Sequence, residues 1–242
     1  MRKVKITEHL FQISGVQYGT NSNIYAIQTE EGLVLIDCGY QEEQWKKMLS
    51  CMEKWNLDPM NIKTVFLTHS HFDHAGNVWR MNQLGADVLA SAEDAEKIEH
   101  GNPEMEQLFG SPWKCGRITR TIREGDSFTF GGQVEINVLE TPGHSKGSLS
   151  FLISVDGIRA LCTGDLFFVK PWPPEDKVDV ELGYMGGWDF DMKAYQNSLR
   201  RLRNVKADIF LPGHYYFYRG ADVHSLFEMA CEKEERGKHV GA

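Results

Sequence analysis

Three of the chain's nine histidines and one aspartate lie within six residues, in the stretch Thr68-His69-Ser70-His71-Phe72-Asp73-His74-Ala75-Gly76. Imidazole and carboxylate are the ligands that zinc and related divalent ions prefer. Residues 63–67 are predicted to form a strand. Side chains two residues apart on an extended segment face the same way, so His69 and His71 can bind the same metal ion. If a helix begins directly afterwards, Asp73 and His74 reach a second point nearby. A polar loop that contains histidine by chance is the alternative, and the crowding argues against it.

Three later segments share one feature, a histidine or an aspartate just after a predicted strand. They are Thr141-Pro142-Gly143-His144, Thr163-Gly164-Asp165 and Leu211-Pro212-Gly213-His214. Each ligand-type residue follows a glycine, which lets backbone approach closely, and loops at strand ends can converge. A single histidine after a strand is usually structural, but three such segments together with residues 69–74 predict one shared metal site.

Charge and size exclude several classes of protein. The 242 residues fit one domain, 1–242, better than two, and 41% hydrophobic and 25% charged residues are ordinary for a globular chain. The formal net charge of -8 disfavours nucleic acid and anionic lipid as partners. We expect a small-molecule substrate, whereas the sequence leaves the oligomeric state open.

Cysteine usage and hydropathy indicate the compartment. Five cysteines are present, an odd number with no C-x-x-C pair, so we interpret them as buried apolar residues of a cytoplasmic protein rather than as disulfides. The basic N-terminus is not followed by an apolar segment of the secretory type. No run reaches about 18 apolar residues, so we expect no membrane-spanning helix.

Hydrophobic periodicity predicts the regular elements. Strands are expected at residues 4–6, 10–13, 23–28, 33–36, 63–67, 87–90, 127–130, 134–139, 148–153, 158–162 and 209–211. Helices are expected at residues 41–55, at 75–84, after a Ser91 cap, from Asp189 or Asp191 to Arg203, and at 222–236. The segments 101–118 and 170–188 are rich in Gly, Pro and Trp and are expected to be irregular. This order predicts an α+β fold, a four-layer αββα sandwich of two mixed β-sheets with helices on the outer faces.

The ligand-type motifs resemble those of the metallo-β-lactamase-fold superfamily. The resemblance runs from residue 69 to residue 214 and fills all seven positions of the family's dinuclear pattern. It implies one metal held by His69, His71 and His144, a second held by Asp73, His74 and His214, and Asp165 as the bridge between them. It also implies that Asp37, in Leu35-Ile36-Asp37-Cys38-Gly39, fixes a ligand histidine.

By the same resemblance the chain is a metal-dependent hydrolase with two divalent metal ions, zinc by preference and iron or manganese as alternatives. Two ions roughly 3.5–4 Å apart lower the pKa of a shared water, which attacks a carbonyl or phosphoryl centre. Asp73 is the expected catalytic residue, because it can pass a proton to the leaving group. Neither Ser70 nor Ser145 is expected to be a nucleophile.

The resemblance narrows the substrate class. Penicillin hydrolysis is disfavoured because class B1 lactamases carry cysteine where Asp165 stands, and flavodiiron proteins carry glutamate where His71 stands. Nucleases of this fold need an inserted domain and a basic surface. An ester, thioester or lactone is therefore expected. The alternatives are a mononuclear iron oxygenase acting on a persulfide, a phosphodiesterase of the same fold, and a binding or regulatory protein without catalysis.

Six residues near the expected site carry two interpretations each: Trp172, Tyr184, Trp188, Tyr18, Lys146 and Lys170. The three aromatic residues after Asp165 either form an apolar wall for the substrate or pack their own loop against the sheet. The tyrosine of the early Gly-rich loop either overhangs the site or covers core. The two lysines either meet an anionic group of the substrate or are solvated.

Overall fold

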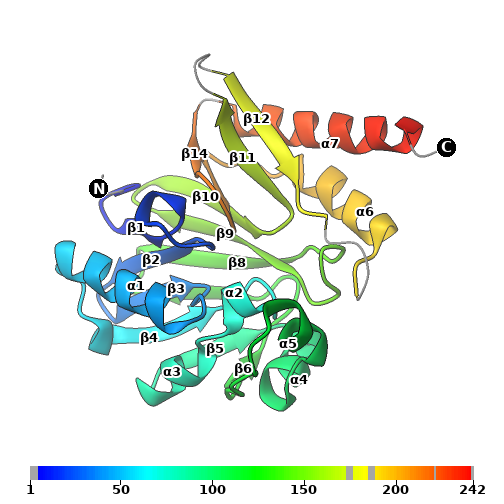
Figure 1. The fold of residues 1–242 in the computed structure, drawn as a ribbon. Helices are drawn as coiled ribbons and strands as arrows, with labels where there is room; N and C mark the ends of the chain where they lie inside the picture. Colours follow the sequence, from blue (N-terminus) through cyan, green and yellow to red (C-terminus); the bar gives the residue numbers. More distant parts are fainter. Residues whose placement is uncertain (1–4, 173–176, 185–188, 221, 241–242) are drawn as a thin grey trace.

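Two six-stranded β-sheets pack face to face in the computed structural model, and helices cover both outer faces (Figure 1). The structure describes residues 5–172, 177–184, 189–220 and 222–240. Both sheets mix parallel and antiparallel pairs. The predicted α+β fold, a four-layer αββα sandwich, is therefore confirmed.

The first sheet is antiparallel at one edge and parallel at the other. Its strands are, in order, β1 (Leu10–Ser14), β2 (Ile24–Thr29), β3 (Gly32–Ile36), β4 (Ile62–Phe66), β5 (Asp87–Ala90) and β6 (Arg120–Thr121). The first three pair antiparallel, whereas β3 to β6 pair parallel. The carboxyl ends of β3 and β4 therefore open at the same edge of the sheet, and the loops after them meet there.

The second sheet has the order β14-β13-β10-β9-β8-β7. Its strands are β7 (Ser127–Phe130), β8 (Val134–Glu140), β9 (Leu149–Val155), β10 (Ile158–Gly164), β13 (Ile209–Pro212) and β14 (Tyr218–Arg219). Asp156 and Gly157 form the predicted hairpin turn between β9 and β10, with φ of 54° and 73°, the signs that a type I′ turn requires. The strands β10 and β13 are parallel neighbours, so the residues that follow them lie side by side.

Helices lie on the outer face of each sheet (Figure 1). Those of the first half are α1 (Glu42–Lys54), α2 (Phe72–Ala75), α3 (Val78–Gln83), α4 (Ala92–His100) and α5 (Pro103–Phe109), with the 3-10 turns η1 (Val16–Tyr18) and η2 (Pro59–Asn61). The second half contributes α6 (Met192–Leu202) and α7 (Val223–Val240). As its spacing predicts, α1 buries Met48, Cys51 and Met52. The side chains of Ser91 and Asp191 cap α4 and α6.

Alternating strand residues build the core between the two sheets. Tyr25, Ile36 and Phe66 of the first sheet and Phe151 and Ile153 of the second belong to one buried cluster. The rings of Phe66 and Phe151 meet edge to face, with centroids 5.4 Å apart. Burial of each such side chain contributes about 1.5–3 kcal/mol. The packed sheets therefore give the loops at their edge a rigid base.

The expected strand at residues 4–6 does not form in the part of the chain that the structure describes. Lys5 makes only an isolated bridge with Phe11. The N–H group of Ile6 donates to the carbonyl of Leu10 at 2.9 Å, which closes a turn instead. Residue 4 lies outside the described residues.

The expected helix at residues 75–84 is divided in two. Helix α2 ends at Ala75 and α3 begins at Val78. Between them, the backbone N–H of Asn77 donates to Gly39 O at 2.9 Å, and its side-chain amide donates to Cys38 O at 3.1 Å. These bonds to the loop after β3 replace helical continuation, a tertiary effect that periodicity does not reveal.

The expectation that residues 101–118 are irregular is wrong at α5. Asn102 caps this helix by accepting from the N–H of Met105 at 3.3 Å, and Pro103 stands at its first position. Both are recognised signals of a helix start. Seven residues are too few for an apolar period to show, which is why the pattern was not decisive.

The expectation that residues 170–188 are irregular is also wrong in part. Strands β11 (Phe167–Trp172) and β12 (Lys177–Leu182) form an antiparallel hairpin. Pro171 is compatible with β11 because, in a sheet of two strands, each strand has one edge outside the ladder; on that edge of β11, Val169 makes an isolated bridge with Tyr215. Residues 173–176 and 185–188 lie outside the described part.

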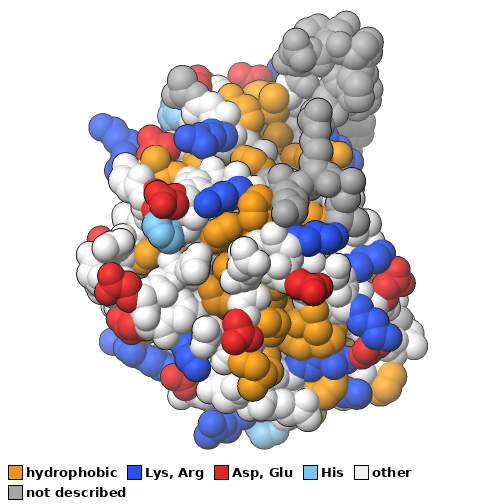
Figure 2. Space-filling view, turned by 90° about the vertical axis from the view of Figure 1, so that its left-hand side faces the viewer, with side chains coloured by type: hydrophobic (Ala, Val, Ile, Leu, Met, Phe, Trp, Pro, Cys, Tyr) orange, Lys and Arg blue, Asp and Glu red, His pale blue; other side chains and the backbone are white. Residues whose placement is uncertain are grey.

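The structure also bears on membrane-spanning helices, on the thiols and on the charge of the surface. Among the described residues, no helix has both the length and the hydropathy needed to span a bilayer. All five cysteines are free thiols, as predicted. Cys38, Cys51 and Cys162 are buried, whereas the expectation of burial is wrong for Cys115, which is exposed, and holds only in part for Cys231. On the face shown in Figure 2, acidic and basic side chains are interspersed around a group of hydrophobic ones.

Candidate metal centre

All seven residues that the sequence analysis selected lie at one edge of the sandwich. They come from the segment after β4, from α2, and from the loops after β8, β10 and β13: His69, His71, Asp73, His74, His144, Asp165 and His214. The parallel pairing of β10 with β13 continues past their ends, because Gly213 N–H donates to Gly164 O at 2.8 Å. The fold thus places loops from both sheets around one point.

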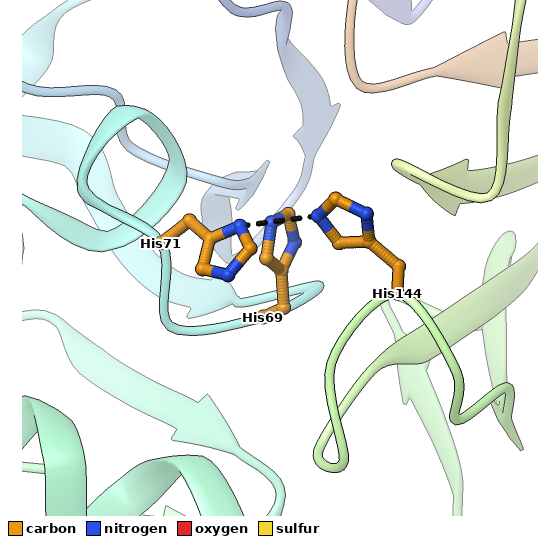
Figure 3. Close-up of side chains that lie close together, drawn as sticks. All are labelled: His69, His71 and His144. Carbon is orange, nitrogen blue, oxygen red and sulfur yellow. Dashed lines mark hydrogen bonds between the residues drawn. The ribbon is translucent and has the colours of Figure 1, made fainter. Parts of the chain in front are cut away.

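Three histidines form the first group (Figure 3). Nε2 of His144 lies 3.1 Å from Nδ1 of His71. The ring of His69 has its centroid 4.5 Å from that of His71 and 4.8 Å from that of His144. All three side chains are buried, and their ligand atoms lie within 4.8 Å of one another. This spacing suits three ligands of one ion.

A second group combines carboxylate and imidazole. Nε2 of His214 lies 3.2 Å from Oδ2 of Asp73, and Nε2 of His74 lies 3.7 Å from the same oxygen. The two imidazole nitrogens are 3.3 Å apart. These three ligand atoms also lie within 4.8 Å of one another.

Asp165 stands between the two groups. Its Oδ2 lies 3.6 Å from Nε2 of His144 and 3.2 Å from Nε2 of His214. The same oxygen is 4.0 Å from Nε2 of His69, and Oδ1 is 3.3 Å from Nε2 of His74. One carboxylate therefore faces histidines of both groups, the position expected of a bridge.

In four of the five histidines, Nε2 points to the centre and Nδ1 has a partner elsewhere. These partners are Thr68 Oγ1 for His69 at 3.0 Å, Asp37 Oδ2 for His74 at 2.8 Å, Gly183 O for His144 at 2.7 Å and Asn21 O for His214 at 3.2 Å. A partner on the outer nitrogen fixes the ring orientation, so the inner nitrogen is the one directed at the centre.

Asp37 makes several further hydrogen bonds. Besides His74, it accepts from the backbone N–H of Thr68 at 2.8 Å and from its hydroxyl at 2.9 and 3.1 Å. Its φ of 62° is a left-handed conformation that Asp and Asn tolerate better than most residues. As expected, Asp37 fixes a candidate ligand.

The two groups differ in their protonation. Burial lowers the pKa of His71 to about 3 and also lowers the pKa of His144. Burial would lower the pKa of His214 as well, but the carboxylates of Asp165 and Asp73 outweigh it and raise that pKa to about 10. The carboxylates of Asp165, Asp73 and Asp37 also outweigh burial at His74 and raise its pKa. The three-histidine group is therefore neutral at pH 7, whereas the histidines of the second group are protonated.

Two buried atoms at the centre, Nε2 of His69 and Oδ1 of Asp165, form no hydrogen bond within the described residues. Leaving such an atom unpaired costs about 1–3 kcal/mol. A divalent cation between them would offset that cost, and imidazole nitrogen and carboxylate oxygen are suitable donors. The residues present fit a metal ion.

Glycines beside the candidate ligands permit this packing. A Cβ on Gly213 would overlap Oδ1 of Asp165 and lie 2.8 Å from Cε1 of His74. Gly143 has a φ of 139° and lies directly against the backbone of Tyr195. Residues with side chains are excluded at both positions, so the Gly-His pairs of the sequence have a geometric cause.

A cavity of about 310 Å³ opens over the cluster. Five of the seven candidate ligands line it, and its walls also include Val16, Leu108, Phe168, Tyr184 and Tyr215. No lysine or arginine is among the described residues that line it. The cavity therefore matches a small, largely apolar molecule.

The aromatic residues with two interpretations differ in where they lie. Tyr184 lines the cavity, which supports its role as a wall. Tyr18 is 3% exposed and packs in the core beneath the first sheet, so it covers core rather than the site. The side chain of Trp172 and the whole of Trp188 lie outside the described part of the chain.

Neither lysine is among the residues that line the cavity. Lys146 is exposed, and its backbone N–H donates to Oδ2 of Asp189 at 3.2 Å. Lys170 pairs with Glu181, and its Nζ lies 4.5 Å from the ring centroid of Tyr215. The solvated interpretation fits Lys146 better, whereas Lys170 stands beside the cavity wall.

The sequence analysis missed four residues of the wall, Val16, Leu108, Phe168 and Tyr215. Phe168 comes three residues after Asp165, and Tyr215 follows His214 directly, so adjacency to candidate ligands was an available signal. Leu108 lies on α5, whose existence the sequence did not predict.

The fold and the cluster of ligand-type residues agree with one family model. The family model described as the metallo-beta-lactamase superfamily matches residues 18–214. The chain belongs to that superfamily.

Individual relatives share the fold at modest identity. An atrochrysone carboxyl ACP thioesterase from Aspergillus fumigatus is 25% identical over 215 residues, 89% of this chain and 56% of that protein. A hydroxyacylglutathione hydrolase from Idiomarina loihiensis is 26% identical over 144 residues, 58% of this chain and 46% of that protein. The chain thus spans about half the length of these two relatives. A solved metallo-beta-lactamase from Cronobacter sakazakii matches with a TM-score of 0.75 at 20% identity, over 100% of both chains.

Proposed function

We propose that this chain hydrolyses a small ester, thioester or lactone with two divalent metal ions held at the cluster. The observation that carries the proposal is the convergence of seven ligand-type side chains around two buried unpaired atoms. One ion would be held by His69, His71 and His144, the other by Asp73, His74 and His214, with Asp165 between them.

Such ions, when bound, lower the pKa of water and polarise a substrate oxygen. The chain supplies the proton transfer. Oδ2 of Asp73 accepts from Nδ2 of Asn21 at 3.0 Å and borders the cavity. A carboxylate held in this way can take a proton from water and deliver it to the leaving group.

The cavity supports an acyl substrate. Leu108 and Tyr184 offer apolar surface beside the candidate metal centre, and no lysine or arginine among the described lining residues is available for a phosphate. The names of two relatives, a thioesterase and a hydroxyacylglutathione hydrolase, support hydrolysis of this kind. A phosphodiester substrate fits this cavity less well.

Zinc is the proposed metal, because five imidazoles and two carboxylates are typical of its sites, with iron and manganese as alternatives. A reducing compartment, the cytoplasm, is proposed on the five free thiols.

Metal analysis of the purified protein, joined to a hydrolysis panel, tests the proposal. We expect two zinc ions per chain and turnover of thioesters or lactones that a chelator abolishes and added zinc restores. One iron per chain with oxygen consumption would instead identify an oxygenase. Failure to hydrolyse any ester, thioester, lactone or phosphodiester with both ions bound would refute catalysis.

A further inference from the structure

The carboxylate of Asp94 on α4 is a buried charge that the chemistry above does not use. It is 0% exposed. It accepts from the backbone N–H of Ser70 at 3.1 Å and from the Ser70 hydroxyl at 2.9 Å. Ser70 stands between His69 and His71, so these two bonds tie the backbone of two candidate ligands to α4.

The same carboxylate packs against the loop that carries His144. Gly147 in that loop lies so close that a Cβ there would stand 2.6 Å from Oδ2 of Asp94. Only a residue without a side chain fits this approach. Asp94 therefore touches both segments that supply the three-histidine group.

Lys97, one turn further along α4, adds a second connection. Its Nζ lies 3.6 Å from Oδ1 of Asp94 and also pairs with the carboxylate of Asp189. That carboxylate in turn accepts from the backbone N–H of Lys146. A chain of charged groups thus runs from Ser70 to the His144 loop.

A role confined to capping α4 does not explain these contacts. The cap is made by the hydroxyl of Ser91, which accepts from the backbone N–H of Asp94 at 3.2 Å. The carboxylate of Asp94 takes no part in that bond. Its partners all lead to the loops of the candidate metal centre.

We propose that Asp94 is a positioning residue for the three-histidine site, setting the placement of His69 and His71 relative to His144 through Ser70 and Gly147. The inference rests on the metal centre of the proposed function. The inference goes beyond the proposed function because it assigns a positioning role to a residue that is neither a candidate metal ligand nor part of the cavity lining. Outer residues that orient ligands typically change metal affinity by about 10–100-fold.

The test is titration of Zn²⁺ into metal-free protein by calorimetry, with a competing chelator to resolve two affinities. Asp94→Asn keeps the size of the side chain and removes its charge. Ser70→Ala removes the hydroxyl group that donates to Asp94. This variant provides the test if Asp94→Asn does not fold. Glu96→Gln, an exposed position on the same helix, is the matched control. Of the two Zn²⁺ affinities measured in the parent protein, the one that disappears in His71→Ala belongs to the three-histidine site.

We expect Asp94→Asn to weaken the three-histidine site roughly tenfold and to leave the other site unchanged. Ser70→Ala should act in the same direction, the Co²⁺ absorption spectrum of that site should shift, and Glu96→Gln should match the parent protein. Equal loss at both sites, or no loss at either, would overturn the role of Asp94. A parent protein that binds no Zn²⁺ would instead refute the metal centre itself.

Discussion

Nε2 of His144 lies 3.1 Å from Nδ1 of His71, although 73 residues separate them in the chain. His71 is the residue that precedes α2 after the first sheet, and His144 follows β8 of the second. Two imidazole nitrogens this close in a buried place need a proton or a cation between them. Because burial lowers the pKa of both rings, both are neutral at pH 7. One ring can then donate its N–H to the other, and a metal ion would bind the lone pairs of both.

Removal of one of these rings should remove metal and activity together. In His71→Ala we expect a loss of catalytic efficiency greater than the roughly 10–100-fold typical of an outer partner, because a direct ligand disappears. Metal per chain and hydrolysis rate are measured side by side. The control His100→Ala changes an exposed histidine at the end of α4 and should keep both values. Normal turnover in His71→Ala would contradict the assigned site.

Asp37 should control the second group through His74. Asp37→Asn is the informative change, because Asn tolerates the left-handed φ of 62° whereas other residues would add strain. The loss of the carboxylate beside Nδ1 of His74 should weaken zinc binding at that group about 10–100-fold. Equilibrium dialysis measures it. Unchanged affinity would show that the 2.8 Å contact does not tune the ligand.

The sequence predicted the ligands of this site better than it predicted their support. His69 and His71 could be paired from the strand period alone, and His144 and His214 from the glycine before each. The contact of Ser70 with Asp94 spans 24 residues and two separate elements. No local pattern encodes such a contact, so Asp94 looked like a residue of the first helical turn and nothing more.

The same distinction explains the errors in the fold. Strands of the two main sheets show a clear apolar pattern, with alternation where one face is buried, as in β8, and a continuous run where both are, as in β3. The hairpin of β11 and β12 contains Pro171, which argues against a central strand but is compatible with a two-stranded sheet. The break between α2 and α3 depends on Asn77 bonding across to Gly39, a tertiary contact.

Proton release should distinguish the two metal sites. Asp165 and Asp73 raise the pKa of His214 to about 10 against the effect of burial, so its ring is protonated in metal-free protein at pH 7. Its contribution to folding stability is full below the unfolded value of about 6.5 and is lost as pH rises toward 10. A metal must displace this proton, and His74 of the same group also has a raised pKa. Affinity at the second group should therefore rise by about tenfold or more per pH unit between 7 and 10.

Calorimetry in buffers of different ionisation enthalpy measures that proton. The three-histidine site should bind without proton release over the same range, because the pKa of His71 is about 3. The two sites therefore serve as controls for each other. Identical proton counts at both sites would contradict the assignment of Asp73 and His214 to a separate group.

The apolar wall should set preference for acyl length. Leu108 is 48% exposed yet lines the cavity, so it is available to contact a substrate chain. In the parent protein, catalytic efficiency should rise with each added methylene, by at most about fourfold since a buried CH₂ is worth about 0.8 kcal/mol. Leu108→Ser should flatten this rise and leave the shortest substrate almost unaffected. Met60→Ser, at an exposed position on η2, should keep the full slope. A Leu108→Ser variant with the same slope would place the acyl chain elsewhere.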